Sequence, residues 1–276
     1  MVKLAGIFGQ MRPFRALVIG DFMFDAYTEG RAKRVSPEAP VLVLQVERSS
    51  FRPGGAGNVA LNLAALGASV HVCGRIGSDA EGELLIDRLK SSHIETEGLL
   101  REMNYKTPIK NRLMADNQQL LRVDIETVAP LLGEYEAQVI AYLEDAIAKM
   151  SVVAVSDYGK GFLTHSILAA AIAIAKRYNV PLVVDPKGTD FTKYRGAFLI
   201  KPNVGEAYGA AKLSNSYSLD QVAKILLEQT QVKHLLITRS EEGISYYDKD
   251  LCLGGGQIQE RREELYRPMM DLCTVQ

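Results

Sequence analysis

The stretch that decides the fold is VVAVSDYGKGFLTHSILAAAIAIAKRYNVPLVVDPKG, residues 152–188. Two short apolar runs, 152–156 and 181–185, flank a segment with apolar residues at the spacing of one helix face: Ile167, Leu168, Ala171, Ile172 and Ala175. Thr164 is a candidate N-cap, and the helical pattern ends at Asn179. The stretch predicts a strand, a packed crossover helix and a second strand.

The same kind of apolar run recurs along the chain, as ALVIG (16–20), VHVCG (70–74), AFLI (197–200) and HLLIT (234–238). Short, nearly continuous hydrophobic strands separated by helices are typical of a parallel sheet covered on both faces. We therefore expect an α/β fold with a mostly parallel central sheet.

Two regions have a different pattern. Residues 25–48 and 105–125 alternate polar and apolar positions and contain turn residues, which favours a small antiparallel β flap beside the main sheet. Such a flap serves either as a lid over a pocket or as a dimer contact. Because there is no internal repeat and no low-complexity linker, we interpret residues 1–276 as a single domain carrying the flap as an insertion.

The composition favours a cytoplasmic enzyme that acts on small molecules. The 276 residues are 47% hydrophobic, and 32 basic against 33 acidic side chains give a net charge of -1, so we expect neither nucleic acid nor a membrane as partner. The three cysteines, Cys73, Cys252 and Cys273, are widely spaced and suggest neither a disulfide framework nor a zinc site. The N-terminal residues contain no apolar run of signal-peptide length.

A glycine-rich segment, RPGGAGNVALNLAALG (52–67), precedes a helical pattern. Glycines there let the backbone approach a ligand, and the free amides of the helix start favour anionic or polar groups. Asn58 lies in the predicted first turn. The segment also fits the dinucleotide pattern G-x-G-x-x-A, which would indicate an oxidoreductase, but Pro53 and the SSF before it are expected to separate the glycines from any preceding strand. Close packing of a small-residue helix is the structural alternative.

Polar clusters follow the predicted strands, where open α/β sheets bind their ligands. Each cluster alone could be a solvated loop, but together they predict a polar pocket built from these residues: Asp21 and Asp25; Asp157 and Lys160; Asp185 and Lys187; Lys201, Asn203 and Glu206. Lysines suit phosphate oxygens, and carboxylates suit sugar hydroxyls or a hydrated Mg²⁺. The mixture indicates a phosphorylated polyol and a nucleotide, bound without a P-loop, because no G-x-x-x-x-G-K-[ST] occurs.

Taken together, several stretches resemble the kinase domain of the bacterial heptose-7-phosphate kinases, which are ribokinase-like (PfkB) carbohydrate kinases. These stretches are GDFMFDAYTEGRAKRVSPEAPV, RPGGAGNVALNLAALGA, NQQLLRVD, SDYGKG, DPKGTDFTKYRGA, KPNVGEA and LLITRSEEGIS. The resemblance implies a three-layer α/β/α fold with a β flap, and ATP and Mg²⁺ as cofactors. It also implies phosphorylation of heptose 7-phosphate at the anomeric hydroxyl, a step toward ADP-heptose and lipopolysaccharide. A homodimer through the flap is one of the two uses of the flap named above.

The resemblance also implies roles for individual positions. It places these residues on the substrate side: Asp25, Gly54, Gly55, Asn58, Arg112, Lys160, Asp185 and Lys187, with Arg122 as a further candidate for the sugar phosphate. The clusters that follow the predicted strands add Asp21 and Asp157 to the substrate side. The resemblance places these on the nucleotide side: Asn203, Glu206, Thr238, Arg239, Ser240 and Gly243, with Glu206 acting on Mg²⁺ indirectly.

The chain departs from this family at Ala26, at Gly57 and, above all, near its end. Relatives carry a G-A-G-D turn whose amides bind the moving phosphoryl group and whose aspartate is the general base, whereas this chain reads EELYRPMMDLCTV. Asp271 lies there without the glycine turn, so we assign it no catalytic role. We expect residues 254–276 to be a tail outside the family pattern, the C-terminal helices and any nucleotidyltransferase domain to be missing, and kinase activity to be impaired. The alternative is a non-catalytic sugar-phosphate-binding protein.

Overall fold

The computed structural model describes residues 12–253. Its main sheet has the strand order β11-β10-β9-β8-β7-β1-β3-β4, and β11 alone runs antiparallel to its neighbour in this sheet. The strands are β1 (Arg15–Val35), β3 (Ser69–Gly77), β4 (Glu95–Glu102), β7 (Val152–Ser156), β8 (Leu182–Asp185), β9 (Leu199–Ile200), β10 (His234–Thr238) and β11 (Ile244–Asp248). The expected mostly parallel sheet is confirmed.

Helices cover both faces of this sheet. Alternate residues of β1 point into different cores: Leu17 and Ile19 into one, Val18 into the other. The first core is closed by α4 (Gly133–Ile147), α5 (His165–Arg177), α6 (Val204–Ala211) and α7 (Leu219–Thr230), and the second by α2 (Ala56–Ala65) and α3 (Ala80–Lys90). Short helical turns are η1 (Thr192–Tyr194), η2 (Ser240–Glu242) and α8 (Lys249–Leu253). The three-layer α/β/α architecture is therefore confirmed.

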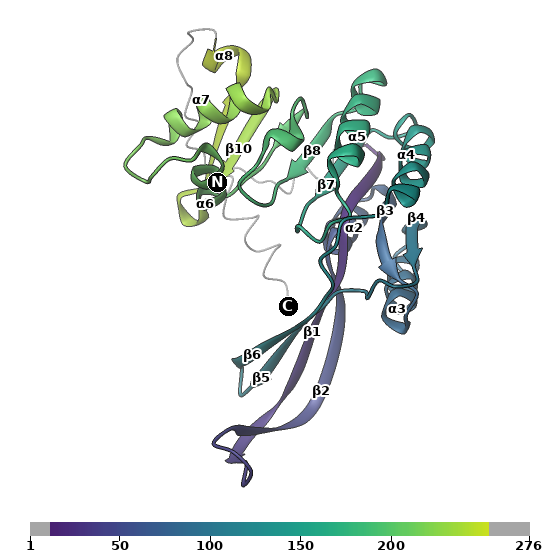
Figure 1. The fold of residues 1–276 in the computed structure, drawn as a ribbon, viewed down its shortest axis with the longest axis vertical. Helices are drawn as coiled ribbons and strands as arrows, with labels where there is room; N and C mark the ends of the chain where they lie inside the picture. The colour runs from purple at the N-terminus through teal and green to yellow at the C-terminus, as the bar shows by residue number, and fades with distance from the viewer. Residues whose placement is uncertain (1–11, 254–276) are drawn as a thin grey trace.

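β1 is one continuous strand that belongs to two sheets. Its residues 15–21 pair with β3 and β7, and from Phe22 onward it pairs with β2 (Leu42–Gly55) and β5 (Ile109–Ala115). β5 pairs in turn with β6 (Gln118–Ile125). We call residues 22–35 of β1 together with β2, β5 and β6 the flap, and Figure 1 shows it projecting from the α/β body. Both hairpins of the flap are antiparallel, whereas β1 and β5 run parallel.

The register of the flap strands gives the flap two different faces, because successive side chains of a strand point to opposite sides. One face has mainly charged residues: Asp25, Tyr27, Arg52, Lys110, Arg112, Arg122 and Asp124. The other face is mostly apolar: Phe24, Ala26, Phe51, Ile109, Leu113, Leu121, Val123 and Ile125. We call these the charged face and the apolar face of the flap.

Several sequence expectations can be compared directly with these elements. β7 and β10 coincide with the predicted runs, and Thr164 caps α5 by accepting a hydrogen bond from Ile167 N at 3.3 Å. Two expectations were incomplete. β4 was not anticipated, and the gap expected at Pro53 does not exist, because β2 continues through Gly55 directly into α2. β2 is antiparallel to β1, however, so the glycines do not lie in a βαβ unit of the dinucleotide-binding kind.

The single-domain interpretation and the flap limits of 25–48 and 105–125 stay predictions. The predicted tail, residues 254–276 with Asp271, lies outside the described residues. Between residues 12 and 253, no helix is both long enough and apolar enough to cross a membrane.

Candidate active site

The predicted polar residues gather at the carboxyl ends of four neighbouring strands, β10, β9, β8 and β7, and beside them where β1 leaves the main sheet. The sequence placed Asp21 and Asp25 after the first strand, but β1 continues through both of them into the flap. Main-chain contacts join the loops there: Asp157 N donates to Asp185 O at 3.1 Å, and Thr238 N donates to Pro202 O at 3.0 Å. Parallel strands bring their carboxyl ends to one edge of a sheet, so the clusters meet although they are far apart in sequence.

Asp21 is buried below the surface of this edge. Its Oδ2 accepts hydrogen bonds from Tyr158 N at 2.8 Å and Lys160 N at 3.1 Å, and the residue is 3% exposed. Burial raises the pKa of this carboxyl group, the two amides oppose the shift, and the nearby Asp157 charge adds to it. These contacts give Asp21 a role in shaping the loop after β7.

Asp25 lies on the charged face of the flap, opposite the start of α2. Its Oδ1 accepts a hydrogen bond from Arg112 Nη1 at 2.7 Å, and this contact raises the pKa of the guanidinium. A Cβ atom at position 54 would lie 2.3 Å from Asp25 Oδ2, so Gly54 leaves the room that this carboxylate occupies. The structure thus brings together Asp25, Gly54 and Arg112, as expected.

The start of α2 has free amides, as the glycines predicted. Gly55 is the N-cap with φ +56°, a conformation that favours glycine, and no side chain caps the helix. Asn58 is exposed in the first turn. Unsatisfied N–H groups at a helix start favour an anion or a hydroxyl oxygen as partner.

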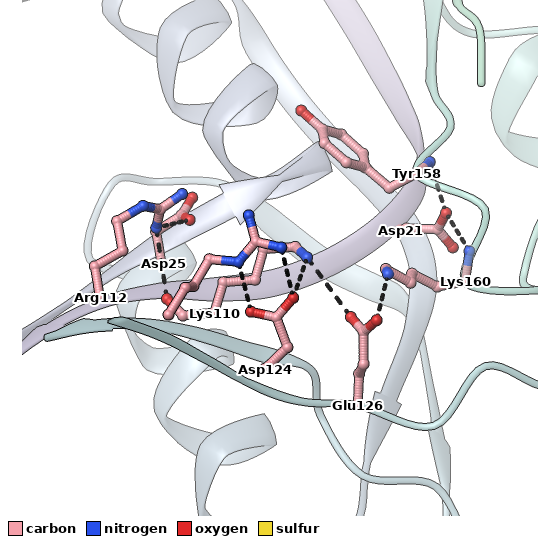
Figure 2. Close-up of polar contacts among 9 residues, drawn as sticks. Asp21, Asp25, Lys110, Arg112, Asp124, Glu126, Tyr158 and Lys160 are labelled. Carbon is pink, nitrogen blue, oxygen red and sulfur yellow. Dashed lines mark hydrogen bonds and ion pairs between the residues drawn. The ribbon is translucent and has the colours of Figure 1, made fainter. Parts of the chain in front are cut away.

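A chain of ion pairs connects the flap to the loop after β7 (Figure 2). Lys160 Nζ lies 2.7 Å from Glu126 Oε1, and Lys110 Nζ lies 3.7 Å from Glu126 Oε2. Lys110 also contacts Asp124 at 3.3 Å, and Arg122 binds Asp124 through Nε at 2.9 Å. The predicted Lys160 and Arg122 therefore belong to one network, which includes three residues that the sequence did not single out, Lys110, Asp124 and Glu126.

Asp157 is held inside the protein by contacts to two loops. Its Oδ1 accepts from Gly159 N at 2.7 Å, and its Oδ2 accepts from Lys193 Nζ at 2.7 Å and Tyr194 Oη at 2.6 Å. The Asp157 side chain is 2% exposed. Its predicted role as a direct substrate ligand is untested, and its position favours a role in holding the loops.

The ends of β8 and β9 carry two further cation–carboxylate pairs. Lys201 Nζ lies 2.9 Å from Asp185 Oδ1, and Lys187 Nζ lies 3.2 Å from Glu206 Oε1. Asn203 and Glu206 form a capping box at the start of α6, since Asn203 Oδ1 accepts from Glu206 N and Glu206 Oε2 accepts from Asn203 N. The N-x-x-E spacing thus has a clear structural role in capping the helix.

The predicted nucleotide strand and turn lie beside α6. Thr238 forms a β-bridge with Asn203, and Arg239 N donates to Gly243 O at 2.8 Å to close the turn. Ser240 has φ +51° and Gly243 has φ +90° within this turn. Asn203, Thr238 and the 239–243 turn are therefore neighbours, which places the predicted nucleotide-side residues together.

Chemically, the edge is a surface of alternating charges. Each lysine or arginine in this group contacts a carboxylate: Arg112 with Asp25, Lys160 with Glu126, Lys187 with Glu206, and Lys201 with Asp185. A bound phosphate can replace a carboxylate as the partner of a lysine, while the carboxylate becomes available to hydroxyls. Within residues 12–253 no group of three or more His, Cys, Asp and Glu side chains could hold a metal ion directly. A cation held by one carboxylate, water and ligand phosphates fits this donor set.

Sequence reasoning missed residues that act through others. Arg75 is 2% exposed and donates to Ala129 O at 2.7 Å and Lys160 O at 2.9 Å, so it supports the loop after β7. Tyr158 projects from the same loop, and burial together with the charges of Asp185, Asp25 and Glu206 raises the pKa of its hydroxyl. The sequence held one signal for each of them: Arg75 is the arginine near the end of the strand run VCGRIG, and Tyr158 is the tyrosine of SDYGKG.

The chain is similar to curated proteins over most of its length. It is 44% identical over 250 residues to the bifunctional protein HldE of Geobacter metallireducens, covering 90% of this chain and 51% of that protein. It is 44% identical over 253 residues to the bifunctional protein HldE of Campylobacter jejuni subsp. doylei, covering 91% and 53%. The chain thus spans about half the length of these relatives.

Its fold resembles solved structures at lower identity. The crystal structure of phosphofructokinase-2 from Escherichia coli in complex with potassium superposes with a TM-score of 0.68 at 19% identity, covering 85% of this chain and 75% of that one. A family model for the pfkB family carbohydrate kinases matches residues 14–261. On the extent of that match and the identity to its relatives, the chain belongs to the pfkB family of carbohydrate kinases.

Proposed function

We propose that this chain is the kinase part of a heptose-7-phosphate kinase, the enzyme type that transfers the γ-phosphate of ATP to the anomeric hydroxyl of heptose 7-phosphate. Three observations support the proposal: the family, the sequence motifs and the 44% identity to bifunctional HldE proteins. The observation that carries it is the row of cation–carboxylate pairs at the strand ends, because a sugar phosphate and a nucleotide need both kinds of group side by side.

The proposal divides the edge into two halves. On the flap side, Asp25, Asn58 and the Gly54–Gly55 backbone bind sugar hydroxyls, and Arg112, which contacts Asp25, offers its guanidinium to the phosphate on the sugar. Across the edge, Lys187 and the start of α6 receive the nucleotide phosphates, with Mg²⁺ held through water near Glu206. Magnesium would neutralise phosphate charge during transfer, and the lysines of the chain would orient the oxygens.

We further propose that the 276-residue chain binds these ligands but turns them over slowly. No G-A-G-D occurs in its sequence, and in RPMMDLC (267–273) Pro268 has no amide hydrogen to donate. In the relatives this turn supplies the aligned amides for the developing charge and the base for the anomeric hydroxyl, so its absence from the sequence is the reason we expect slow turnover. A protein that only binds the sugar phosphate is the limiting case of this proposal.

Calorimetry and a turnover assay test the two parts separately. We expect heptose 7-phosphate to bind more tightly than the unphosphorylated heptose and than fructose 6-phosphate, and ATP to bind in the presence of Mg²⁺. ADP formation should be far slower than in a full-length HldE protein measured in parallel. Equal affinity for all three sugars would contradict the substrate assignment, and rapid Mg²⁺-dependent ADP formation would contradict the impairment.

For the oligomeric state, we propose a homodimer in which a second copy covers the apolar face of the flap. Four side chains of that face are at least 38% exposed although they are large and apolar: Phe51, Leu121, Val123 and Ile125. Exposed apolar side chains of this kind, on a sheet whose other face is charged, favour burial against an identical sheet.

Light scattering after gel filtration tests the dimer. Leu121→Glu should shift the protein from dimer to monomer, because a carboxylate would be buried in the contact. Met103→Glu is the matched control: Met103 is 84% exposed and lies outside the flap, so this variant should stay dimeric. A monomeric unsubstituted protein would disprove the proposal.

A further inference from the structure

The loops after β7 and β8 lie side by side and carry three of the predicted ligand residues, Asp157, Lys160 and Lys187. Gly159 and Lys187 come close, since a Cβ at Gly159 would lie 3.9 Å from Lys187 Cγ. Neither loop belongs to a helix or strand, so the relative position of the two lysines depends on contacts between the loops. One buried side chain, Tyr194 of η1, makes those contacts.

Tyr194 is fully buried, and its hydroxyl both donates and accepts a hydrogen bond. It donates to Asp157 Oδ2 at 2.6 Å and accepts from Lys187 N at 3.1 Å. Burial raises the pKa of this hydroxyl, and the Asp157 charge raises it further, so the group stays protonated and remains a donor. A single oxygen atom thus connects the carboxylate after β7 to the main chain after β8.

Asp157 completes the connection. Its other oxygen accepts from Gly159 N at 2.7 Å, which fixes the backbone immediately before Lys160. Lys193, adjacent to Tyr194 in η1, supplies a positive charge 2.7 Å from Asp157 Oδ2, so the buried carboxylate is neutralised. Between the exposed residues Gly159 and Lys187, the path runs through the buried side chains of Asp157 and Tyr194.

We propose that Tyr194 is a positioning residue: acting through Asp157 and the Lys187 amide, it sets the spacing of Lys160 and Lys187 and thereby the affinity for the anionic ligand between them. The role rests on the proposed function, in which these lysines meet phosphate groups. No family motif quoted above assigns a role to this tyrosine. Its hydroxyl lies under the site and need not touch the ligand.

The test is Tyr194→Phe, which removes one oxygen and keeps the buried ring. Tyr247→Phe is the matched control, because Tyr247 is also buried, at 3% exposure, and also donates to an aspartate, Asp220 Oδ1, at 3.0 Å. Tyr247 pairs with Leu235 at the start of β10, the end of the sheet away from the site. The two variants therefore lose the same kind of hydrogen bond in different places.

Two measurements are made on both variants. In calorimetry, Tyr194→Phe should weaken binding of heptose 7-phosphate or ATP by about tenfold, the change that corresponds to about 1.4 kcal/mol, while Tyr247→Phe binds as the unsubstituted protein does. In amide hydrogen exchange, the Lys187 and Gly159 amides should exchange faster in Tyr194→Phe only.

The outcomes separate this proposal from the proposed function. If the unsubstituted protein binds neither ligand, the proposed function fails, and the exchange of Lys187 and Gly159 still decides whether Tyr194 holds the loops. Unchanged exchange and unchanged affinity in Tyr194→Phe would overturn the positioning role. Equal losses in both variants would also overturn it, because they would reflect general destabilisation.

Discussion

The ammonium group of Lys160 lies 2.7 Å from the carboxylate of Glu126, and this contact joins the loop after β7 to the end of the flap. The two side chains are 12% and 21% exposed, so water screens the pair only partly. Lys160 is a predicted ligand residue. Glu126 therefore holds the Lys160 side chain in place, and it also competes with a ligand phosphate for the ammonium group.

A double-mutant cycle measures what this ion pair contributes. With Lys160→Met and Glu126→Gln, we expect a coupling free energy of unfolding of about 1–2 kcal/mol, between the values typical of exposed and of buried pairs. The matched control is Arg177 with Glu144, whose side chains are 59% and 41% exposed, where the coupling should stay below about 0.5 kcal/mol. Urea denaturation provides the free energies, and equal coupling in the two pairs would refute the expectation.

The buried guanidinium of Arg75 should matter far more than an exposed one. Arg75→Met leaves Glu102 and the carbonyls of Ala129 and Lys160 without their donor. We expect the free energy of unfolding to fall by roughly 3–5 kcal/mol, as for a broken buried pair. Arg101→Met breaks the exposed pair with Glu83 and should cost no more than about 1 kcal/mol. Similar losses in the two variants, compared by denaturant titration, would show that burial does not decide the cost.

Gly55 should not tolerate a side chain. Its φ of +56° disfavours other residues, and a Cβ would lie 2.5 Å from the carbonyl oxygen of Asp21. Gly55→Ala is expected to destabilise the protein by roughly 2–4 kcal/mol, whereas Gly133→Ala, at the start of α4 with nothing within 4 Å of the new Cβ, should have little effect. Thermal unfolding of both variants checks this, and a stable Gly55→Ala protein would disprove the steric argument.

Asp21 should make stability depend on pH. Its pKa is raised above the ordinary value of 3.8, so the folded state binds a proton that the unfolded state has released. The contribution of this group to the free energy of unfolding therefore decreases as pH rises from the unfolded pKa through the folded pKa. Asp21→Asn removes this term, so its stability relative to the unsubstituted protein should increase as the pH rises above about 4. A constant difference across that range would contradict the raised pKa.

The main elements of the fold followed from the sequence because their signals are local. β7 and β10 are buried runs with nearly continuous apolar residues, and the Thr164 cap marks the start of α5. β4 gave no such signal, because ETEGLLRE is an edge strand with charged residues at four of its eight positions. The sequence also did not predict that β2 continues through Pro53, because that segment is held extended by its pairing with β1.

For the site, the sequence could indicate which polar residues follow the strands, but not which contacts hold their side chains in place. Lys160 and Asp157 were found because they follow an apolar run. Their partners Glu126 and Tyr194 lie 34 and 37 residues away in sequence, and no periodicity reports a contact over such distances. The predicted ligand roles stay predictions, and the structure adds the supports through which they can be tested.

The membership of β1 in two sheets limits how this protein can change in evolution. Between Gly20 and Asp25 the strand passes from the body to the flap without a break, so both sheets share one alternation of side chains. Inserting or deleting one residue there would exchange the two faces for the residues of β1 that follow, and would place Asp25 on the apolar face and Phe24 or Ala26 on the charged face. A change of two residues in this segment therefore keeps both faces as they are, whereas a change of one residue needs a compensating register shift, such as those that β1 and β2 already have between Glu29 and Gly30 and between Arg31 and Arg34.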